Sequence, residues 1–482
     1  MNVIVLDIIN VVALVYFAAL NLTYLGLTLA SFPRTNRYIA RLKSLHVEEL
    51  LSAAGSLPIS LLVPAFDEEA TIAEATRSLL TLRYPEYEII VVNDGSNDAT
   101  VDVLTEAFDM APAHRLPTSA ITTAGVRQIL RSRVHPHLWL VDKDNGGKAD
   151  ALNAGLNHSR YPLFAALDAD TLLESDALIR IARPFLEDQR TVAAGAMIRI
   201  ANGCRIKGGE VEEVALPHRL IPEFQIVEYL RAFFVGRTGW DAIGGTLIIS
   251  GAFGVFRRSI VAAAGGFSTD TVGEDMELVV RLHRYCREND IPYRISFVPD
   301  PVAWTEAPET LRSLGLQRSR WQRGLAQTLT RHISMMGNPR YGTPGVLAYP
   351  YHFFLELFGP LIEALGYLSF GITLALGLAS PRFVVAFVFL SVFLGSALSV
   401  AAVALEEMSF RRYRKGRDLA VMLGLALIET LGYRHLNTYW RLKGMWAFLR
   451  GDNDWGTMDR RGFGEENGAA TPAAPVVGET SR

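Results

Sequence analysis

The chain has few cysteines, little excess charge and no nucleotide-binding P-loop. Cys204 and Cys286 are its only cysteines in 482 residues, which excludes a disulfide framework. One disulfide is conceivable, but two buried thiols in a reducing cytosol are favoured. The formal net charge of −3 gives no reason to expect a nucleic-acid partner. The Gly-Gly-Lys segment at 146–148 does not have P-loop spacing.

Charge is also scarce in several long stretches, although one fifth of all residues are charged. A hydrocarbon core of about 30 Å takes about 20 helical residues, so long apolar runs predict membrane spans. Residues 40–345 are mixed in character and predict one large aqueous domain. The apolar runs lie at 3–30, 352–378 and 382–404, with a weaker run at 418–433.

These runs predict a multi-pass protein of the cell inner membrane. Residues 1–31 lack a basic leader and a cleavage site, so we expect an anchor and not a removed signal peptide. Basic clusters at 34–43 and 411–417 place the domain at 40–345 in the cytoplasm. Residues 349–450 predict about three helices plus an interfacial segment, and the side on which the chain ends stays open. The tail at 462–482 is expected to be disordered.

The aqueous domain alternates short apolar runs with segments of helical periodicity. The runs that end near 64, 92, 141 and 167 predict buried strands, and the segments between them predict helices. This alternation predicts an α/β fold with a doubly wound, mostly parallel, Rossmann-like sheet. Ligands bind beyond the carboxyl ends of such strands. The polar residues found there are Asp67, Asp94, Lys148, Asp168 and Asp170.

Asp168 and Asp170 follow an apolar strand with one residue between them. Residues i and i+2 of a strand share a face, so both carboxylates can point at one spot. Hard oxygen ligands suit Mg²⁺ or Mn²⁺, which commonly arrive with substrate phosphates. A pair of solvated turn acids is the alternative, and the strand before them favours the metal.

Two further segments carry chemistry later in the chain. Glu274 and Asp275 open an apolar helix, where acids can serve simply as caps. Gln317, Arg320 and Trp321 share one face of a cationic amphipathic segment, which is also typical of an interfacial helix.

Six motifs together resemble the membrane-bound, processive family-two glycosyltransferases, which include cellulose, hyaluronan and poly-N-acetylglucosamine synthases. The resemblance covers residues ~58–325, and the combination is far more specific than any single motif. It implies a GT-A fold, a UDP-sugar donor, a divalent metal and inversion at the sugar carbon. It also implies a polysaccharide acceptor, contact with membrane lipid, and room for an export or accessory subunit. The motifs are LVPAFDEE, VVNDGSNDAT, NGGKADALNAG, LDAD, GED and QRSRW.

For the donor, the resemblance makes Asp170 the direct metal ligand and places Asp168 near the ribose or the metal's water shell. Asp94 would accept a hydrogen bond from uracil, although an Asx turn would use it equally well. Lys148 would meet phosphate or nucleoside, and a surface lysine is the alternative. Asp67 and Glu68 would touch the nucleoside, but the family more often has Asn where Asp67 stands.

For the acceptor, the resemblance makes Asp275 the general base, with Glu274 orienting the loop or contacting the acceptor. Trp321 would stack on the acceptor sugar and Arg320 would reach the donor diphosphate, with Gln317 on the same helical face. Gly251 lies in a small-residue loop, Ser250 to Gly254, that looks like the acceptor loop of the family. The family usually has Thr where Gly273 stands.

Three features complete the expectations. The segment at 201–224 has the composition of a flexible, solvated insertion. Glu356, Glu363 and Glu429 lie in apolar runs and are expected to face a bundle interior. The rival functions are a single-transfer enzyme with a lipid-linked acceptor, and an inactive scaffold or transport subunit.

Overall fold

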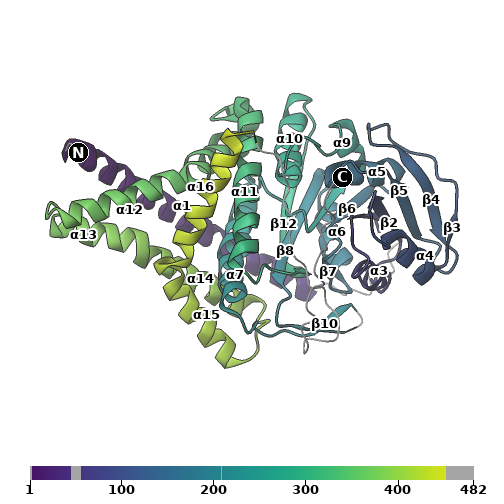
Figure 1. The fold of residues 1–482 in the computed structure, drawn as a ribbon, viewed down its shortest axis with the longest axis horizontal. Helices are drawn as coiled ribbons and strands as arrows, with labels where there is room; N and C mark the ends of the chain where they lie inside the picture. The colour runs from purple at the N-terminus through teal and green to yellow at the C-terminus, as the bar shows by residue number, and fades with distance from the viewer. Residues whose placement is uncertain (1–2, 45–55, 208, 452–482) are drawn as a thin grey trace, which may run out of the picture.

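The structure is a computed structural model that describes residues 3–44, 56–207 and 209–451. An α/β domain lies at one end, and a group of apolar helices projects from it at the other (Figure 1). The tail expected to be disordered lies outside the described residues.

The α/β domain is built from short strands and helices that follow the apolar runs of the sequence. Its first half comprises β1 (Ile59–Ala65), α3 (Ile72–Leu80), β2 (Tyr87–Asp94), α4 (Thr100–Phe108), β3 (Met110–Pro112), β4 (Val126–Ser132), β5 (Leu138–Lys143), α5 (Lys148–His158), β6 (Leu163–Leu167), β7 (Leu172–Leu173) and α6 (Ala177–Glu187). Its second half comprises β8 (Thr191–Ile200), β9 (Arg205–Lys207), β10 (Glu210–Glu213), α7 (Leu220–Tyr229), the π-helix η1 (Leu230–Gly236), α8 (Arg237–Ala242), β11 (Phe253–Arg257), α9 (Arg258–Ala263), α10 (Glu274–Glu288), β12 (Arg294–Thr305) and α11 (Leu311–Arg331).

Ten strands form one sheet in the order β3-β4-β5-β2-β1-β6-β11-β8-β12-β7. The four strands β5, β2, β1 and β6 are parallel, as the alternating pattern predicts. Beyond them β11 runs antiparallel to both β6 and β8, and β3, β4 and β7 also pair antiparallel. Strands β8 and β12 are again parallel to each other, so the sheet is mixed but most of its strands run in one direction, as expected. Alternation of strands and helices predicts parallel pairing only within βαβ units, and not the direction of the other strands.

The hydrophobic core lies on both faces of this sheet. Leu61 and Val63 belong to the cluster on one face, while Leu62 belongs to the cluster on the other. This division follows from the two-residue period of a strand. The polar side chains that follow the strands are thereby left at the edge, where the strands end.

The segment at 201–224 is not simply a loop. It contains the antiparallel pair β9 and β10, and then enters α7 at Leu220. Ile206 and Val211 pack against the buried Trp304. The apolar residues of this short charged stretch alternate, which favours a hairpin. The prediction of a flexible insertion rested on composition alone and did not take this alternation into account.

The apolar helices begin with α1 (Val3–Ser44), which is 42 residues long. At 1.5 Å per residue it extends roughly 60 Å, about twice the thickness of a hydrocarbon core. Its far end therefore continues beside the α/β domain, where it contacts α8. The later elements are η2 (Ile333–Met335), η3 (Pro339–Tyr341), η4 (Pro344–Ala348), η5 (Tyr351–Leu357), α12 (Gly359–Ala375), α13 (Pro381–Val388), η6 (Phe389–Phe393), α14 (Leu394–Ser409), α15 (Gly416–Ile428), η7 (Glu429–Leu431) and α16 (Tyr433–Leu449).

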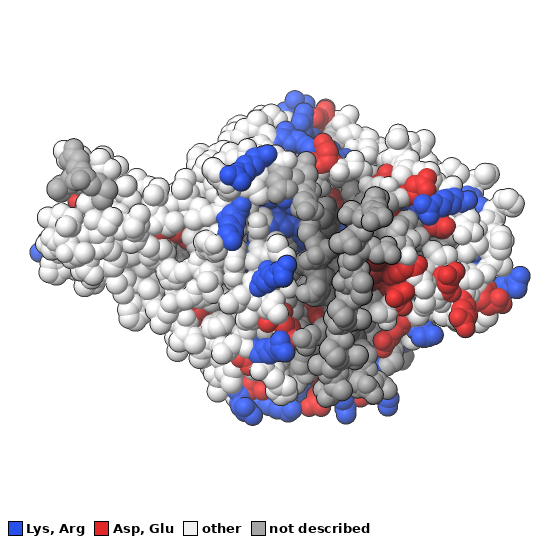
Figure 2. Space-filling view, in the orientation of Figure 1, with Lys and Arg blue, Asp and Glu red and all other residues white. Residues whose placement is uncertain are grey.

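Among the described residues, two helices are long and apolar enough to cross a membrane, at Ile4–Leu42 and Pro381–Ser409. Two bent pairs would raise the number to four if each pair is one span, and the second pair bends by 54° where α16 begins. Helix α16 packs along α11. On the face shown in Figure 2, the projecting end is almost free of charge, and lysines and arginines gather where it meets the α/β domain.

The acids of the apolar segments face the interior, as expected. Glu429 is completely buried, and each of the three acids has a polar partner from another turn or helix. The pairs are Glu429 with Arg434 at 2.7 Å, Glu356 with Arg441 at 3.0 Å, and Glu363 with the Tyr16 hydroxyl at 2.9 Å. Cys204 and Cys286 are free thiols, so the alternative of a disulfide is wrong.

Candidate active site

Asp94 lies at the carboxyl end of β2 and is almost fully buried. Its Oδ1 accepts hydrogen bonds from Lys143 Nζ at 2.5 Å and from the Gly146 amide at 3.0 Å. Its Oδ2 accepts from the amide of Gly147 at 2.7 Å, and Gly147 has φ of +87°, a region that favours glycine. Burial raises the pKa of Asp94, and these hydrogen bonds oppose the rise. Asp94 thus shapes the turn that leads to Lys148, and its expected contact with uracil stays a prediction.

Lys148 opens α5 and points across the rim of the sheet. Its Nζ lies 2.6 Å from Asp168 Oδ1 and 3.1 Å from Glu274 Oε1. Burial alone would lower the pKa of Lys148, but the charges of Asp168 and Glu274 outweigh it and raise the pKa. The alternative of a plain surface lysine is wrong, because Lys148 joins the loop after β6 to the start of α10.

Asp275 lies in the first turn of α10 beside the loop that contains Gly251. The Gly251 amide donates to Asp275 Oδ2 at 2.8 Å, and the Met276 amide donates to Oδ1 at 2.7 Å. Neighbouring Glu274 is 4% exposed, and burial raises its pKa, an effect that Lys148 partly opposes. Both acids are therefore held in fixed positions by backbone amides and a lysine.

One cavity of about 450 Å³ connects these groups with α11. Gln317, Arg320 and Trp321 line it from one side of that helix. Trp321 is 38% exposed, and its ring centroid lies 6.0 Å from that of Phe233. The groups from the rim that line the same cavity are Lys148, Asp168, Gly251, Glu274 and Asp275.

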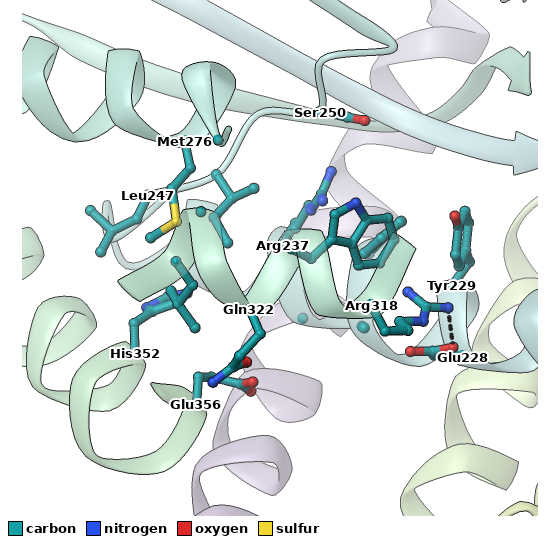
Figure 3. A pocket seen from close by; sticks show the side chains of 18 of the residues that line it. Glu228, Tyr229, Arg237, Leu247, Ser250, Met276, Arg318, Gln322, His352 and Glu356 are labelled. Carbon is teal, nitrogen blue, oxygen red and sulfur yellow. Dashed lines mark hydrogen bonds and ion pairs between the residues drawn. The ribbon is translucent and has the colours of Figure 1, made fainter. Parts of the chain in front are cut away.

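The same cavity continues between the apolar helices. Figure 3 shows Gln322 and Glu356 at this end, while Ser250 and Met276 lie toward the sheet. Gln322 is fixed by Arg441, whose Nε donates to its Oε1 at 2.8 Å. The residues of α1 and of the later helices that line the cavity include Tyr16, Tyr24, Glu356, Glu363 and Thr438.

Four residues expected at the site are outside the set that lines this cavity: Asp67, Glu68, Asp94 and Asp170. Asp67 has φ of +52°, and its Oδ1 accepts from the Asn97 amide at 2.7 Å. Glu68 accepts from the Thr71 hydroxyl at 2.7 Å. The Asp67 contact joins the loop after β1 to the loop after β2, whereas the Glu68 contact stays within the segment between β1 and α3. Asp170 lies in the turn directly after Asp168.

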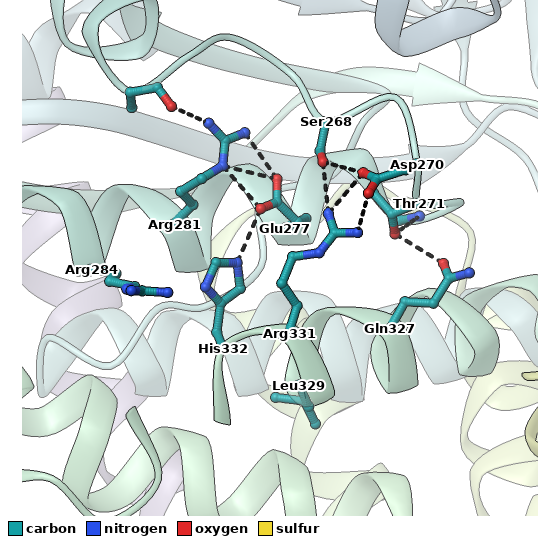
Figure 4. Close-up of polar contacts among 12 residues, drawn as sticks. Ser268, Asp270, Thr271, Glu277, Arg281, Arg284, Gln327, Leu329, Arg331 and His332 are labelled. Atoms are coloured by element: carbon teal, nitrogen blue, oxygen red, sulfur yellow. Dashed lines mark hydrogen bonds and ion pairs between the residues drawn. The ribbon is translucent and has the colours of Figure 1, made fainter. Parts of the chain in front are cut away.

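Helix α11 also touches the loop that carries the two acids of α10. Gln327 Oε1 accepts hydrogen bonds from the Thr271 hydroxyl and the Val272 amide, both at 3.0 Å (Figure 4). A Cβ atom added to Gly273 would lie 3.0 Å from the Cα of Gly324. This close approach gives a physical reason for glycine at 273, where the family usually has threonine.

Several residues of the cavity lie outside the motifs recognised in the sequence. Glu228 accepts from Arg318 at 2.7 Å and from the Tyr433 hydroxyl at 2.7 Å, so it ties α7 to α11 and α16. Phe233 and Arg237 also line the cavity. The only signal in the sequence is that two arginines, Arg231 and Arg237, interrupt an apolar stretch. Such charges need a partner or a ligand when they are buried.

A mixed sheet, with acids beyond its parallel strands and a helix closing the cavity over them, defines a GT-A type of transferase fold. The chain belongs to the glycosyltransferase like family 2, whose family model matches residues 57–324.

Similar proteins include poly-beta-1,6-N-acetyl-D-glucosamine synthases. One from Staphylococcus epidermidis is 28% identical over 273 residues, which are 57% of this chain and 56% of that protein. One from Staphylococcus aureus (strain COL) is 29% identical over 313 residues, which are 64% of each chain. The chain thus spans less than two thirds of these relatives. Among solved structures, a mannosyltransferase from Pyrobaculum calidifontis in complex with GDP-Man and Mn²⁺ has a TM-score of 0.49 and 19% identity, covering 86% of this chain and 99% of its own.

Proposed function

We propose that this protein is a membrane-bound, inverting glycosyltransferase that transfers a sugar from a UDP-sugar to a growing, β-linked polysaccharide. The observation that carries the proposal is the shared cavity. Asp168 and Asp275 line it on the side of the sheet, Trp321 lines it on α11, and Tyr16 and Glu363 line it between the apolar helices. A donor, an acceptor end and a path for product can therefore meet in one space.

Asp168 and Asp170 are the proposed ligands of Mg²⁺ or Mn²⁺. Both are carboxylates on one short turn after β6, which suits a hard cation. Within the described ranges no group of three acidic, histidine or cysteine side chains could hold a metal ion by itself. The two acids fit a cation whose remaining ligands are the donor's phosphates. A cation held by Asp168 and Asp170 would supply positive charge to offset the charge of the departing nucleoside diphosphate.

Asp275 is the proposed general base. The amides of Gly251 and Met276 fix its carboxylate in the cavity, where it would take the proton of the acceptor hydroxyl that attacks the sugar. Trp321 offers a partly exposed ring on which that acceptor sugar would stack. Arg320 lies one residue before it and would contact the donor diphosphate.

The proposed location is the inner membrane, with the α/β domain in the cytoplasm. Cavity-lining hydroxyl and carboxyl groups among apolar helices support a path for the nascent chain through the bilayer. Inverted vesicles supplied with donor test this path, because exported polysaccharide would be enclosed and resist an added glycosidase. Product found only outside such vesicles would contradict export by this route.

A donor screen tests the proposal itself. The purified protein is given UDP-glucose, UDP-N-acetylglucosamine or UDP-glucuronate, with and without Mn²⁺, and both UDP release and product length are measured. We expect one donor to give metal-dependent UDP release and long products, and Asp275→Asn to slow this release by at least about 10²-fold. Products with a single added sugar would favour a single-transfer enzyme, and no release with any donor would favour a scaffold.

A further inference from the structure

Arg237 begins α8 and lines the cavity. Its side chain points toward the loop that carries Ser250 (Figure 3). Asp275 and Trp321 line the same cavity. None of the motifs in the sequence includes Arg237.

The guanidinium of Arg237 has no acid to pair with among the described residues. It forms no ion pair there, and its buried Nη1 has no hydrogen-bond acceptor. Two other arginines of the same cavity also have a buried Nε without an acceptor in the described ranges, but each forms an ion pair: Arg318 lies 2.7 Å from Glu228 and Arg231 lies 3.3 Å from Glu429. Burial lowers the pKa of Arg237 to about 10, and the charge of Asp275 offsets only part of this fall. Arg237 is half-buried, and removing a cation from water without an anionic partner is costly, so this wall of the cavity suits a ligand that carries oxygen atoms.

An aromatic surface orients this guanidinium. The Cζ atom of Arg237 lies 4.0 Å from the centroid of the Phe233 ring, and Phe233 lies beside Trp321. An arginine held over a ring directs its N–H groups outward in the plane of the guanidinium. Sugar rings carry oxygen atoms around an edge and apolar C–H groups on their faces. Phe233, Trp321 and Arg237 together match both properties.

We propose that Arg237 binds the acceptor sugar, donating hydrogen bonds to its oxygen atoms beside the base Asp275. This inference rests on the proposed function, which places the acceptor at Trp321. The donor diphosphate is the other oxygen-rich ligand of the cavity. The acceptor is favoured because Arg237 lies over Phe233, which itself lies beside Trp321, whereas the rim groups Lys148 and Asp168 pair with each other.

The test uses the full-length protein in detergent and two kinds of variant. Arg237→Met keeps a long side chain over Phe233 without donors, and Arg237→Lys keeps the charge without the planar fork. The control is Arg133→Met, because Arg133 is 69% exposed and its nearest acid, Asp109, is 3.4 Å away. Binding of β-linked tetrasaccharides of glucose and of N-acetylglucosamine is measured by calorimetry without donor, and KM is then measured separately for tetrasaccharide and UDP-sugar.

We expect the wild-type protein and Arg133→Met to bind one tetrasaccharide equally. Arg237→Met should lose that binding and raise the acceptor KM at least tenfold, with the donor KM unchanged, and Arg237→Lys should be intermediate. Unchanged acceptor KM in Arg237→Met would overturn the inference, as would a rise confined to the donor KM, which would assign Arg237 to the diphosphate. The binding arm needs no turnover, so it separates this inference from the proposed function. Wild-type protein that binds neither tetrasaccharide would also overturn it.

Discussion

Gly324 offers the sharpest test of how α11 positions the proposed base. A Cβ atom at this position would lie 2.9 Å from the Cα and 3.1 Å from the amide nitrogen of Gly273. Carbon atoms pack at about 3.5–4.0 Å, so Gly324→Ala must push the loop away from the helix by at least about 0.5 Å. The loop leads directly into Glu274 and Asp275. The clash would be with backbone atoms, so no side-chain rotation can relieve it.

The expected effect is larger on catalysis than on stability. A displacement near 1 Å at reacting groups costs about 10²-fold in rate, so kcat should fall between about 10-fold and 100-fold. Overpacking destabilises by about 1–3 kcal/mol, while alanine in a helix returns up to about 1 kcal/mol relative to glycine. The KM for the donor should change little, because the loops after β1 and β2 belong to other parts of the sheet.

The assay is UDP release by purified protein, together with the thermal unfolding midpoint. Gly424→Ala is the matched control, since Gly424 also lies within a helix, α15, but a Cβ there would have no neighbour within 4 Å. The control should keep full activity and be as stable as the wild type or slightly more so. If Gly324→Ala turned over at the wild-type rate, the contact with Gly273 would have no part in holding Asp275.

Three further predictions follow from buried charges at or near the site. Asp275→Asn should lower kcat by about 10²–10⁴-fold and leave UDP binding intact by calorimetry, and a smaller loss would argue against a general base. Lys143→Met should destabilise by about 3–5 kcal/mol in chemical unfolding, because it leaves Asp94 buried without its cation; a change below about 1 kcal/mol would contradict this ion pair. Burial raises the pKa of Glu277, but hydrogen bonds from His332 and a neighbouring arginine outweigh it and hold the pKa below its usual value. Glu277→Gln should therefore lower the free energy of unfolding, with the full loss above about pH 4.5 and a smaller loss as the pH falls through the lowered pKa of Glu277 in the folded protein. A loss that does not change with pH would refute the pairing.

The sequence alone determined the parts of this protein that depend on local pattern. The four parallel strands begin and end almost where their apolar runs do, because burial on both faces requires a continuous run. Asp168 and Lys148 could be placed at the rim for the same reason, since polar residues that follow a buried strand emerge at its end. Family motifs then added Asp275 and Trp321, which share the cavity.

Other features were decided by which distant segments meet, and a local pattern carries no record of that. The helices α7, η1 and α8 precede β11, and they determine the direction in which β11 enters the sheet. The alternation of strands and helices therefore could not predict that β11 is antiparallel to its neighbours. Asp94 lies beneath a glycine turn because Lys143 and two amides hold it there. Among the described residues, the Nη1 atom of Arg237 has no hydrogen-bond acceptor only because the folded wall of the cavity brings none to it. The burial of an arginine and its distance from the nearest acid are set only when the chain folds. These two quantities distinguish an arginine that is proposed to bind a ligand from one that forms an ordinary ion pair.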